Sequence, residues 1–360
     1  MRYRGSKIIL AAILAGMVYN IFLDGASVRA EFTPEISAAS AVVLYEDGSC
    51  VFEKNADEPL PMASTTKLMT ALVASELSEP DTPIEVAAQC CGIEGSSMYL
   101  TAGQILTADE LIAGLLICSG NDAAEALAVG LCGSESAFVE KMNEKAAALD
   151  LRDTSFANPH GLDAEGHFST ARDLAKLMIA CMKSERVARL CALPSLRVRD
   201  QYYVNHNKLL SLCDGCLGGK TGYTRAAGRC LVSCCERDGT RFVCATLSAP
   251  DDWNDHLRLY DGAFAAFSNR LAVSTEERYE IPVAGGTEEK AVAVPEEEIR
   301  LFLPRGERLD YVRELPRFTY APVREGACAG RIVVLRGGEA AGEVKLIFLR
   351  GVERRGEETG

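Results

Sequence analysis

The stretch CLVSCCERDGTRFVCATL, residues 230–247, contains two apolar runs on either side of the dipeptide Asp238-Gly239. An Asp-Gly pair between two such runs is a strong signal for a two-residue β-hairpin turn, because the turn residues need positive φ angles. We therefore predict antiparallel strands over residues 230–235 and 240–247. This hairpin is the most secure part of a β-sheet, and the rest of the fold is built outward from it.

The hairpin also determines which cysteines can meet. A turn at Asp238-Gly239 pairs Arg237 with Thr240, so Cys235 faces Phe242 and Cys244 lies diagonally from Cys235. Diagonal neighbours are too far apart for an easy disulfide. The fourteen cysteines of the chain show no regular disulfide framework, so we expect most of them to be small core-filling residues, with one local disulfide left open.

Upstream of the hairpin, most segments repeat their apolar residues at helical spacing. A second Asp-Gly turn, at Asp47-Gly48, predicts strands over residues 41–45 and 49–52. Asp122 and Glu125 fit a helix-capping box. The predicted helices cover residues 65–77, 108–118, a segment that starts at Asp122, and residues 134–149, 170–182 and 252–267. Strands at both ends with helices between them indicate an α+β fold, an antiparallel sheet covered by helices.

The two ends of the chain differ from this middle part. Residues 1–30 combine a basic start, an apolar run from Ile8 to Leu23 and small residues before Ala30, the pattern of a secretory signal peptide. A retained N-terminal anchor is the alternative. Residues 268–360 contain short strand-like runs separated by Gly or Pro, which predicts a small all-β domain. These runs are residues 278–283, 291–294, 299–303, 331–335 and 344–349. We therefore divide the chain at 1–30, 31–267 and 268–360, and expect export with cleavage near Ala30.

The composition excludes several classes of protein. Of 360 residues, 48% are hydrophobic and 25% charged, so the chain can bury a core. A net charge of −13 and the lack of a Lys/Arg cluster beyond the N-terminus argue against a nucleic-acid partner. No apolar run is long enough for a confident membrane span. The four histidines are scattered and Cys213-x-x-Cys216 is the only CxxC motif, so we expect no metal site.

Three short motifs carry the chemistry, and the first is Ser64-Thr65-Thr66-Lys67. A serine and a lysine three residues apart at the start of a helix lie on the same face, so the amine can reach the hydroxyl. Partial desolvation lowers the pKa of a lysine and lets it take that proton, and the backbone N–H of Ser64 can donate to an oxyanion. A Ser N-cap followed by a surface lysine is the structural alternative.

The second motif is Ser119-Gly120-Asn121, between two apolar helices. A hydroxyl there can relay a proton to a leaving amine, and the Asn amide can hold a substrate carbonyl. An ordinary helix break with Gly at the turn is the structural alternative.

The third motif is Lys220-Thr221-Gly222, followed by Tyr223. A cation beside a hydroxyl can receive a substrate carboxylate. Gly222 permits a close approach of substrate to a strand edge, and the N–H of Tyr223 can serve as a second oxyanion donor. A glycine-rich turn that enters a strand is the structural alternative.

In this order, the three motifs resemble the S-x-x-K, S-x-N and K-T-G signature of the penicillin-recognising serine hydrolases. Longer strings resemble the D-alanyl-D-alanine carboxypeptidases of the low-molecular-mass penicillin-binding protein type. These strings are SSMYL at 96–100, LLICSGNDAA at 115–124, NPHGL at 158–162 and GKTGYT at 219–224. The resemblance covers about residues 35–267 and implies a β-lactamase/transpeptidase-like fold. The β-rich tail resembles the C-terminal domain that many of these proteins carry.

The resemblance implies a serine peptidase that removes the terminal D-alanine from peptidoglycan pentapeptide stems, a step in cell-wall biosynthesis and cell shape. Ser64 would attack the penultimate D-Ala carbonyl with Lys67 as the general base, and Ser119 would relay a proton to the departing D-alanine. β-Lactams would acylate the same serine, and no metal or organic cofactor is implied. The substrate-binding residues would be Asn121, Lys220, Thr221, Gly222 and Tyr223.

Some features depart from the family pattern or support a rival. The end of the chain, residues 351–356, is too short and polar for the membrane-bound amphipathic helix that many members carry, so we do not expect membrane attachment through it. Arg225 and Arg258 are the candidates for an arginine that assists carboxylate binding. The rival functions are a serine β-lactamase, for which Glu165 is the available deacylating base, and a non-catalytic wall-binding scaffold. For His160, we expect a role in ordering its loop, rather than as a base.

Overall fold

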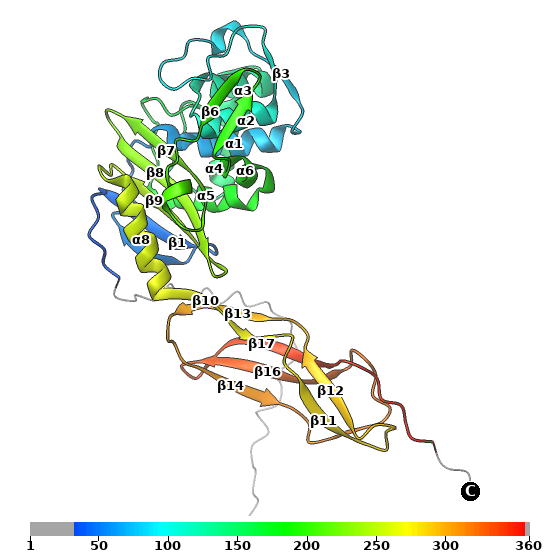
Figure 1. Cartoon of the computed structure of the whole chain (residues 1–360). Helices are drawn as coiled ribbons and strands as arrows, with labels where there is room; N and C mark the ends of the chain where they lie inside the picture. The colour runs from blue at the N-terminus through cyan, green and yellow to red at the C-terminus, as the bar shows by residue number, and fades with distance from the viewer. Residues whose placement is uncertain (1–31, 357–360) are drawn as a thin grey trace, which may run out of the picture.

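The computed structural model describes residues 32–356 of the chain. Its first part contains a five-stranded antiparallel sheet with the strand order β2-β1-β9-β8-β7 (Figure 1). The strands are β1 (Ser40–Tyr45), β2 (Cys50–Lys54), β7 (Cys216–Thr224), β8 (Gly228–Arg237) and β9 (Thr240–Leu247). The predicted signal peptide, residues 1–30, lies outside the described residues.

The predicted hairpin forms β8 and β9, and its register is confirmed. Arg237 pairs with Thr240, and Cys235 pairs with Phe242. Cys244 lies opposite Ser233, so Cys235 and Cys244 are diagonal neighbours, as expected. All fourteen cysteines, which lie within the described residues, are free, and most of them are buried.

Helices cover both faces of this sheet, and the alternation of side chains along the strands explains why. Val42 and Leu44 of β1 belong to a large apolar core under the helices α1 to α6. Ala41 and Val43 point the other way, into a second core that α8 closes. Figure 1 shows α8 against one face of the sheet and α5 against the other. The helix bounds are α1 (Lys67–Leu77), α2 (Ala108–Ile117), α3 (Asn121–Cys132), α4 (Glu135–Ala148), α5 (Ala171–Lys183), α6 (Glu185–Cys191), α7 (Leu209–Leu212) and α8 (Asp252–Ala266), with 3₁₀ turns η1 (Ala63–Thr66) and η2 (Ala88–Cys90).

The α+β fold class is confirmed, but the predicted capping box at Asp122 and Glu125 is wrong. The N-cap of α3 is Gly120, which makes no side-chain cap. Asp122 lies inside α3, and its carboxylate accepts hydrogen bonds from the backbone N–H groups of Met98 and Leu100, at 2.8 and 3.0 Å, as well as from that of its neighbour Ala123 at 2.9 Å. A capping box does occur at the start of α2, where Thr107 and Glu110 satisfy each other's backbone N–H.

Two short hairpins were not predicted. They pair β3 (Pro83–Glu85) with β4 (Ile105–Thr107), and β5 (Ser195–Val198) with β6 (Gln201–Val204). Strands of three or four residues are too short to show a period of two in the sequence.

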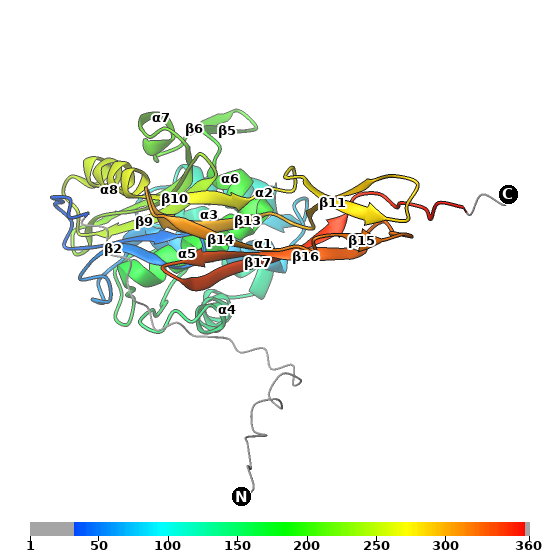
Figure 2. The same cartoon turned by 90° about the horizontal axis from the view of Figure 1, so that it is seen from below.

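The described residues beyond α8, 267–356, form strands joined by turns and contain no helix, as predicted. A six-stranded sheet has the order β14-β16-β17-β12-β11-β15, and β10 pairs with β13. Figure 2 shows this part from below as an elongated body with the C-terminal end far from the helices. The bounds are β10 (Phe267–Val273), β11 (Tyr279–Ala284), β12 (Lys290–Pro295), β13 (Ile299–Pro304), β14 (Leu309–Glu314), β15 (Thr319–Tyr320), β16 (Cys328–Arg336) and β17 (Glu339–Phe348). The strands β10, β14 and β15 were not predicted.

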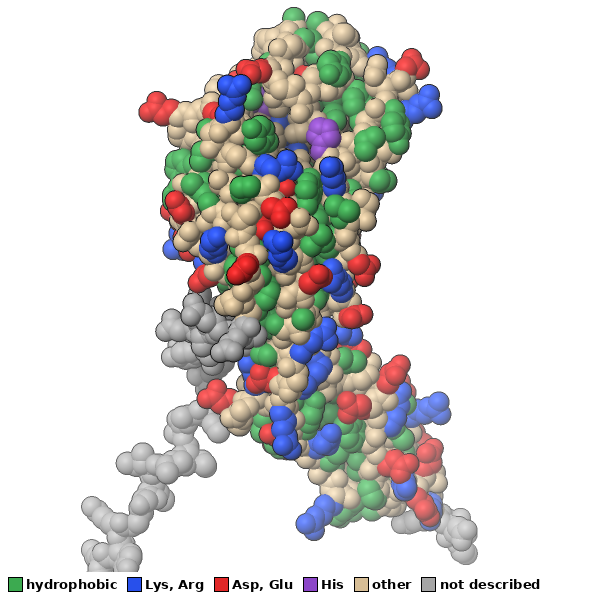
Figure 3. All heavy atoms as spheres, turned by 60° about the vertical axis from the view of Figure 1, so that its left-hand side comes forward, with side chains coloured by type: hydrophobic (Ala, Val, Ile, Leu, Met, Phe, Trp, Pro, Cys, Tyr) green, Lys and Arg blue, Asp and Glu red, His purple; other side chains and the backbone are tan. Residues whose placement is uncertain are grey.

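An aromatic cluster joins the two parts. Phe302 of β13 stacks on Tyr45 of β1, with ring centroids 3.9 Å apart, and also packs on Phe242 and Phe267. On the face shown in Figure 3, Lys/Arg and Asp/Glu side chains are interspersed over both parts. Among residues 32–356, no helix has the length and apolar character needed to cross a membrane.

Candidate active site

Ser64 and Lys67 lie at the junction of η1 and α1, one helical turn apart, as the S-x-x-K spacing predicts. The Lys67 Nζ lies 2.9 Å from Ser64 Oγ, within hydrogen-bond distance. Lys67 is fully buried at the base of α1, while Ser64 is half-buried. A surface lysine next to a serine cap, the structural alternative, is therefore wrong.

The surroundings of Lys67 favour its neutral form. Burial is the main cause, and the positive charge of Lys220 is the second; together they hold the pKa of Lys67 well below its ordinary value of 10.5. Two oxygen atoms fix the direction of the amine: Asn121 Oδ1 at 2.6 Å and the backbone carbonyl of His160. A neutral amine that is held against a hydroxyl can remove its proton, which is the first step of nucleophilic acyl transfer.

The second motif approaches from the loop between α2 and α3. Ser119 is 4% exposed and adopts a φ of 62°. Such a left-handed backbone costs about 1–3 kcal/mol in a residue other than glycine, so the surrounding structure must enforce it. The Asn121 amide nitrogen donates to the Glu94 carbonyl, and its oxygen accepts from Lys67. The loop therefore places Asn121 beside Lys67, with Ser119 two residues earlier in the same loop.

The third motif lies on β7, an edge strand of the sheet. Lys220 is 1% exposed, and burial lowers its pKa from 10.5 to about 8. A Cβ on Gly222 would lie 3.0 to 3.1 Å from Met62 O, Ala63 Cβ and Ser64 N. Gly222 thus permits a close approach of the turn that carries Ser64. Tyr223 is exposed, and Thr221 is partly exposed.

The loop of residues 157–168 closes the other side of Ser64. A Cβ on Gly161, whose φ is +90°, would lie 2.1 Å from Ala63 O, so only glycine fits there. Asn158 ties the loop together by accepting from the Gly161 N–H at 2.7 Å and donating to the Leu162 carbonyl at 2.9 Å. The Leu162 N–H donates to His160 Nδ1 at 3.2 Å, which supports the loop-ordering role predicted for His160.

Sequence reasoning missed several groups at this site. The backbone carbonyl of His160 could not be identified from the sequence, because every residue has a backbone carbonyl. Asp122, read as a helix cap, instead holds the loop of residues 97–100 against α3. His206 is adjacent as well: its N–H donates to the Ile117 carbonyl, and burial and the Lys220 charge lower its pKa.

Among the described residues, no hydrogen bond or ion pair links the candidate arginines or Glu165 to Ser64, Lys67 or Lys220. Arg258 lies on α8, which packs on the opposite face of the sheet, and it faces Asp251 and Asp255 at 3.8 and 3.6 Å. Arg225 is exposed just beyond the end of β7. Glu165 is exposed in the 157–168 loop. Glu125, Glu135 and His160 are the described residues grouped closely enough to hold a metal ion, and they are treated below.

Comparisons with known proteins agree with this geometry. A family model described as D-alanyl-D-alanine carboxypeptidase matches residues 27–251. The carboxypeptidase DacF of Bacillus subtilis is 30% identical over 359 residues, which cover 94% of this chain and 92% of DacF. The crystal structure of penicillin-binding protein 6B from Escherichia coli is 26% identical, covers 88% of this chain and 96% of that one, and superposes with a TM-score of 0.70. The structure of DacD from Francisella tularensis covers 93% of this chain and 100% of that one, at 25% identity and a TM-score of 0.67.

Proposed function

The chain belongs to the D-alanyl-D-alanine carboxypeptidase family and is a serine-type carboxypeptidase of the cell wall; from that premise we propose the role of each residue in the site. Ser64 is the nucleophile and Lys67 is its general base. The observation that carries this assignment is the 2.9 Å contact between Lys67 Nζ and Ser64 Oγ, made by a buried lysine whose pKa is lowered.

In the first half of the reaction, Ser64 Oγ attacks the carbonyl carbon of the penultimate D-Ala, and its proton passes to Lys67 Nζ. The oxyanion that forms is held by the backbone N–H groups of Ser64 and Tyr223. The peptide C–N bond then breaks, and the Ser119 hydroxyl relays a proton to the departing amine. Free D-alanine leaves, and the stem peptide stays bound to Ser64 as an ester.

In the second half, Lys67 is neutral again, because the proton it took from Ser64 has passed through Ser119 to the departing D-alanine. A water molecule attacks the ester carbonyl and gives a proton to Lys67. The bond between the acyl carbon and Ser64 Oγ then breaks, and Lys67 returns this proton to Ser64 Oγ. The terminal carboxylate of the substrate binds to Lys220 and Thr221 on β7. Lys220 Nζ uses one N–H on the Thr221 carbonyl at 2.9 Å, which leaves two for the carboxylate. Asn121 keeps one amide hydrogen for a carbonyl of the stem peptide after its contacts with Lys67 and Glu94.

A β-lactam has the carbonyl and carboxylate of such a substrate, so it acylates Ser64 in the same way. No observation favours a β-lactamase: Glu165, the available deacylating base, is exposed, and no hydrogen bond among the described residues links it to Ser64. The intact pair of Ser64 and Lys67 likewise gives no support to a non-catalytic scaffold.

The decisive experiment incubates the purified protein with a peptide that ends in D-Ala-D-Ala and, separately, with a fluorescent penicillin. We expect release of D-alanine and covalent labelling, both abolished by Ser64→Ala and retained by the exposed control Ser211→Ala. Lys220→Ala should mainly raise KM. Release of D-alanine by Ser64→Ala at the normal rate contradicts the mechanism, labelling without release favours a scaffold, and rapid penicillin turnover favours a β-lactamase.

The location and the domain division are proposed on the same basis. The substrate lies outside the cytoplasmic membrane, so residues 1–30 act as an export signal that is cleaved near Ala30. Residues 31–267 form the catalytic domain, and residues 268–360 form a β-rich domain with its own apolar core. Sequencing the N-terminus of the exported protein tests the cleavage position.

A further inference from the structure

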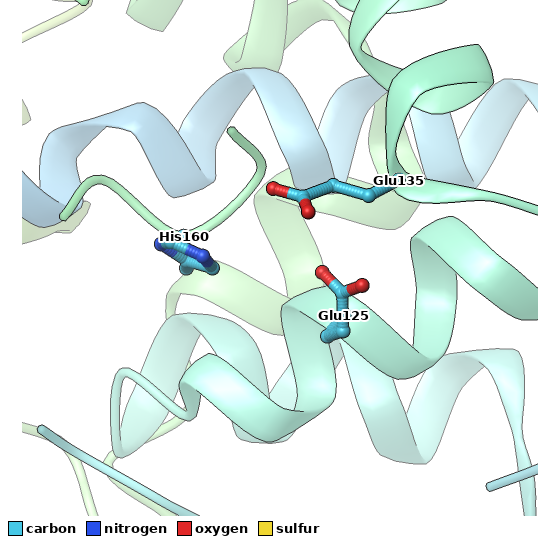
Figure 4. Close-up of side chains that lie close together, drawn as sticks. All are labelled: Glu125, Glu135 and His160. Carbon is cyan, nitrogen blue, oxygen red and sulfur yellow. The ribbon is translucent and has the colours of Figure 1, made fainter. Parts of the chain in front are cut away.

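Three ionisable side chains, one of them from the 157–168 loop, lie close together although they belong to separate elements. Glu125 lies in the second turn of α3, Glu135 is the first residue of α4, and His160 belongs to the 157–168 loop. One ligand atom from each lies within 4.8 Å of the other two. Figure 4 shows the two carboxylates facing each other, with the imidazole beside them. The sequence did not indicate this group, since its members are 10 to 35 residues apart.

Glu125 is the unusual member of this group. It is only 7% exposed, and its Oε2 is buried without a hydrogen-bond partner among residues 32–356. A buried carboxylate oxygen with no donor loses its hydration without compensation. Figure 4 shows this carboxylate directed at Glu135, which is itself half-buried and carries the same charge.

Among residues 32–356, no lysine or arginine pairs with either carboxylate. Within the described residues, neither Glu125 nor Glu135 forms an ion pair or accepts a hydrogen bond by the usual distance criteria. Burial, and then the charge of Glu135, raises the pKa of Glu125 to about 7. A bound positive charge would remove both penalties at once.

We propose that Glu125, Glu135 and His160 form a binding site for a divalent metal ion of the zinc class. Two carboxylates and one imidazole are a donor set that Zn²⁺ takes, with one or more water molecules completing its shell. Atoms bound to one such ion at about 2.1 Å are at most about 4.2 Å apart. The present separations are at most 4.8 Å, so side-chain movements of up to about 0.6 Å bring the ligand atoms into that range.

The histidine defines how binding proceeds. Leu162 N–H occupies Nδ1, so Nε2 is the ring atom available to the ion. A metal on Nε2 requires the ring proton on Nδ1. A protonated Nδ1 cannot accept the Leu162 N–H, so His160 loses that 3.2 Å hydrogen bond and gains a metal bond at Nε2. The ion then links the loop to α3 and α4.

This link reaches the catalytic residues indirectly. The carbonyl of His160 accepts from Lys67 Nζ, and the loop around it closes one side of Ser64. A metal that fixes His160 therefore has a positioning role and takes no part in bond making. Binding itself does not depend on the proposed catalytic function.

The test measures zinc content after equilibrium dialysis of the full-length protein, with the rise in melting temperature as a second readout. We expect one ion per chain for the wild type. Glu125→Gln and Glu135→Gln should each weaken binding at least tenfold and abolish the zinc-dependent rise. Glu165→Gln, in the same loop but exposed, is the matched control and should bind normally.

Because the chain has fourteen cysteines, the ligand type must be checked. Co²⁺ in place of Zn²⁺ should give a spectrum without sulfur-to-metal charge transfer. Zinc binding that survives in both glutamine variants, a thiolate spectrum, or no binding by the wild type each overturns the proposal. If Glu125→Gln fails to fold, Glu135→Gln, on another element, decides the question. D-alanine release by the same preparations reports the catalytic function separately.

Discussion

Replacing Lys220 with methionine removes a positive charge that β7 holds out of contact with water, and we expect the protein to become more stable. Lys220 is 1% exposed, and no carboxylate pairs with it among the described residues. Methionine has a similar length and no charge, so it can fill the same space without a large cavity. The substitution should at the same time remove carboxylate binding, so stability and activity change in opposite directions.

The magnitude follows from the pKa. A fall from 10.5 to about 8 means that the charged side chain destabilises the fold by about 3 kcal/mol at neutral pH, at 1.36 kcal/mol for each factor of ten. The variant also loses the hydrogen bond from Lys220 Nζ to Thr221 O, worth about 1 kcal/mol. We therefore expect Lys220→Met to raise the free energy of unfolding by about 2 kcal/mol at pH 7.

The pH dependence separates this charge effect from a packing effect. The pKa of Lys220 is lower in the folded state, so its unfolded side chain binds more protons between pH 8 and 10.5, and the destabilisation that Lys220 causes in the wild type decreases as the pH rises through that window. The advantage of the variant should therefore shrink by about 2 kcal/mol between pH 7 and 9.5. Buried thiols also titrate there, but they are common to both proteins and cancel in the difference.

Equilibrium urea unfolding at pH 7 and 9.5 measures both quantities, with Lys208→Met as the control. Lys208 is exposed, so its substitution should change stability by no more than about 0.5 kcal/mol. A Lys220→Met protein that is less stable than the wild type at pH 7 refutes the reasoning. So does a difference that stays constant up to pH 9.5.

Three further outcomes follow from the site and the core. The value of kcat/KM should fall above about pH 8 as Lys220 loses its proton. Lys220→Arg should remove this decrease at alkaline pH, because a guanidinium stays charged. A profile of kcat/KM against pH tests this, and a decrease that is unchanged in the variant must come from another group. Gly222→Ala should slow acylation by fluorescent penicillin by about tenfold to a hundredfold, since its Cβ would displace the turn that carries Ser64; acylation at the wild-type rate contradicts this. The free energy of unfolding should decrease above about pH 9, because burial raises the pKa of thiols such as Cys181 and Cys244. These thiols ionise at their ordinary pKa of 9.0 only after unfolding. Urea unfolding curves at pH 7.5 and 9.5 measure the decrease, and Cys181→Ala should make it smaller.

Local patterns predicted the elements, and contacts distant in sequence decided the exceptions. The Asp238-Gly239 turn and the period of two in its flanking runs were enough for the register of β8 and β9, because both signals lie within the hairpin. Asp122 shows the opposite case. Its spacing to Glu125 satisfies the capping pattern, yet its carboxylate bonds to residues more than twenty positions earlier. The local pattern shows only the donors at the start of α3 and not those of Met98 and Leu100, so it cannot predict which of them the Asp122 carboxylate binds.

The site divides in the same way. Serine, lysine and asparagine at fixed spacings were recognisable because their hydroxyl, amine and amide groups are part of the side chain and so follow from the residue type. The carbonyl of His160, which directs Lys67, was not, because a backbone group leaves no trace in the residue type. The sequence indicated that another group lies close to Gly222, but only the structure shows that this group is the turn that carries Ser64.

The two buried lysines also explain how binding and catalysis can be coupled. The charge of Lys220 contributes to the lowered pKa of Lys67, although burial contributes more. A substrate carboxylate bound to Lys220 offsets that charge, so it raises the pKa of Lys67 and makes the amine a stronger base once the substrate is in place. The acid limb of the acylation profile should therefore differ between a penicillin with its free carboxylate and the neutral methyl ester of the same compound. We expect the midpoint to lie at higher pH in the complex with the carboxylate, measured by single-turnover acylation at saturating concentration. Coincident midpoints would show that Lys67 does not sense the charge on β7 and that burial alone sets its basicity.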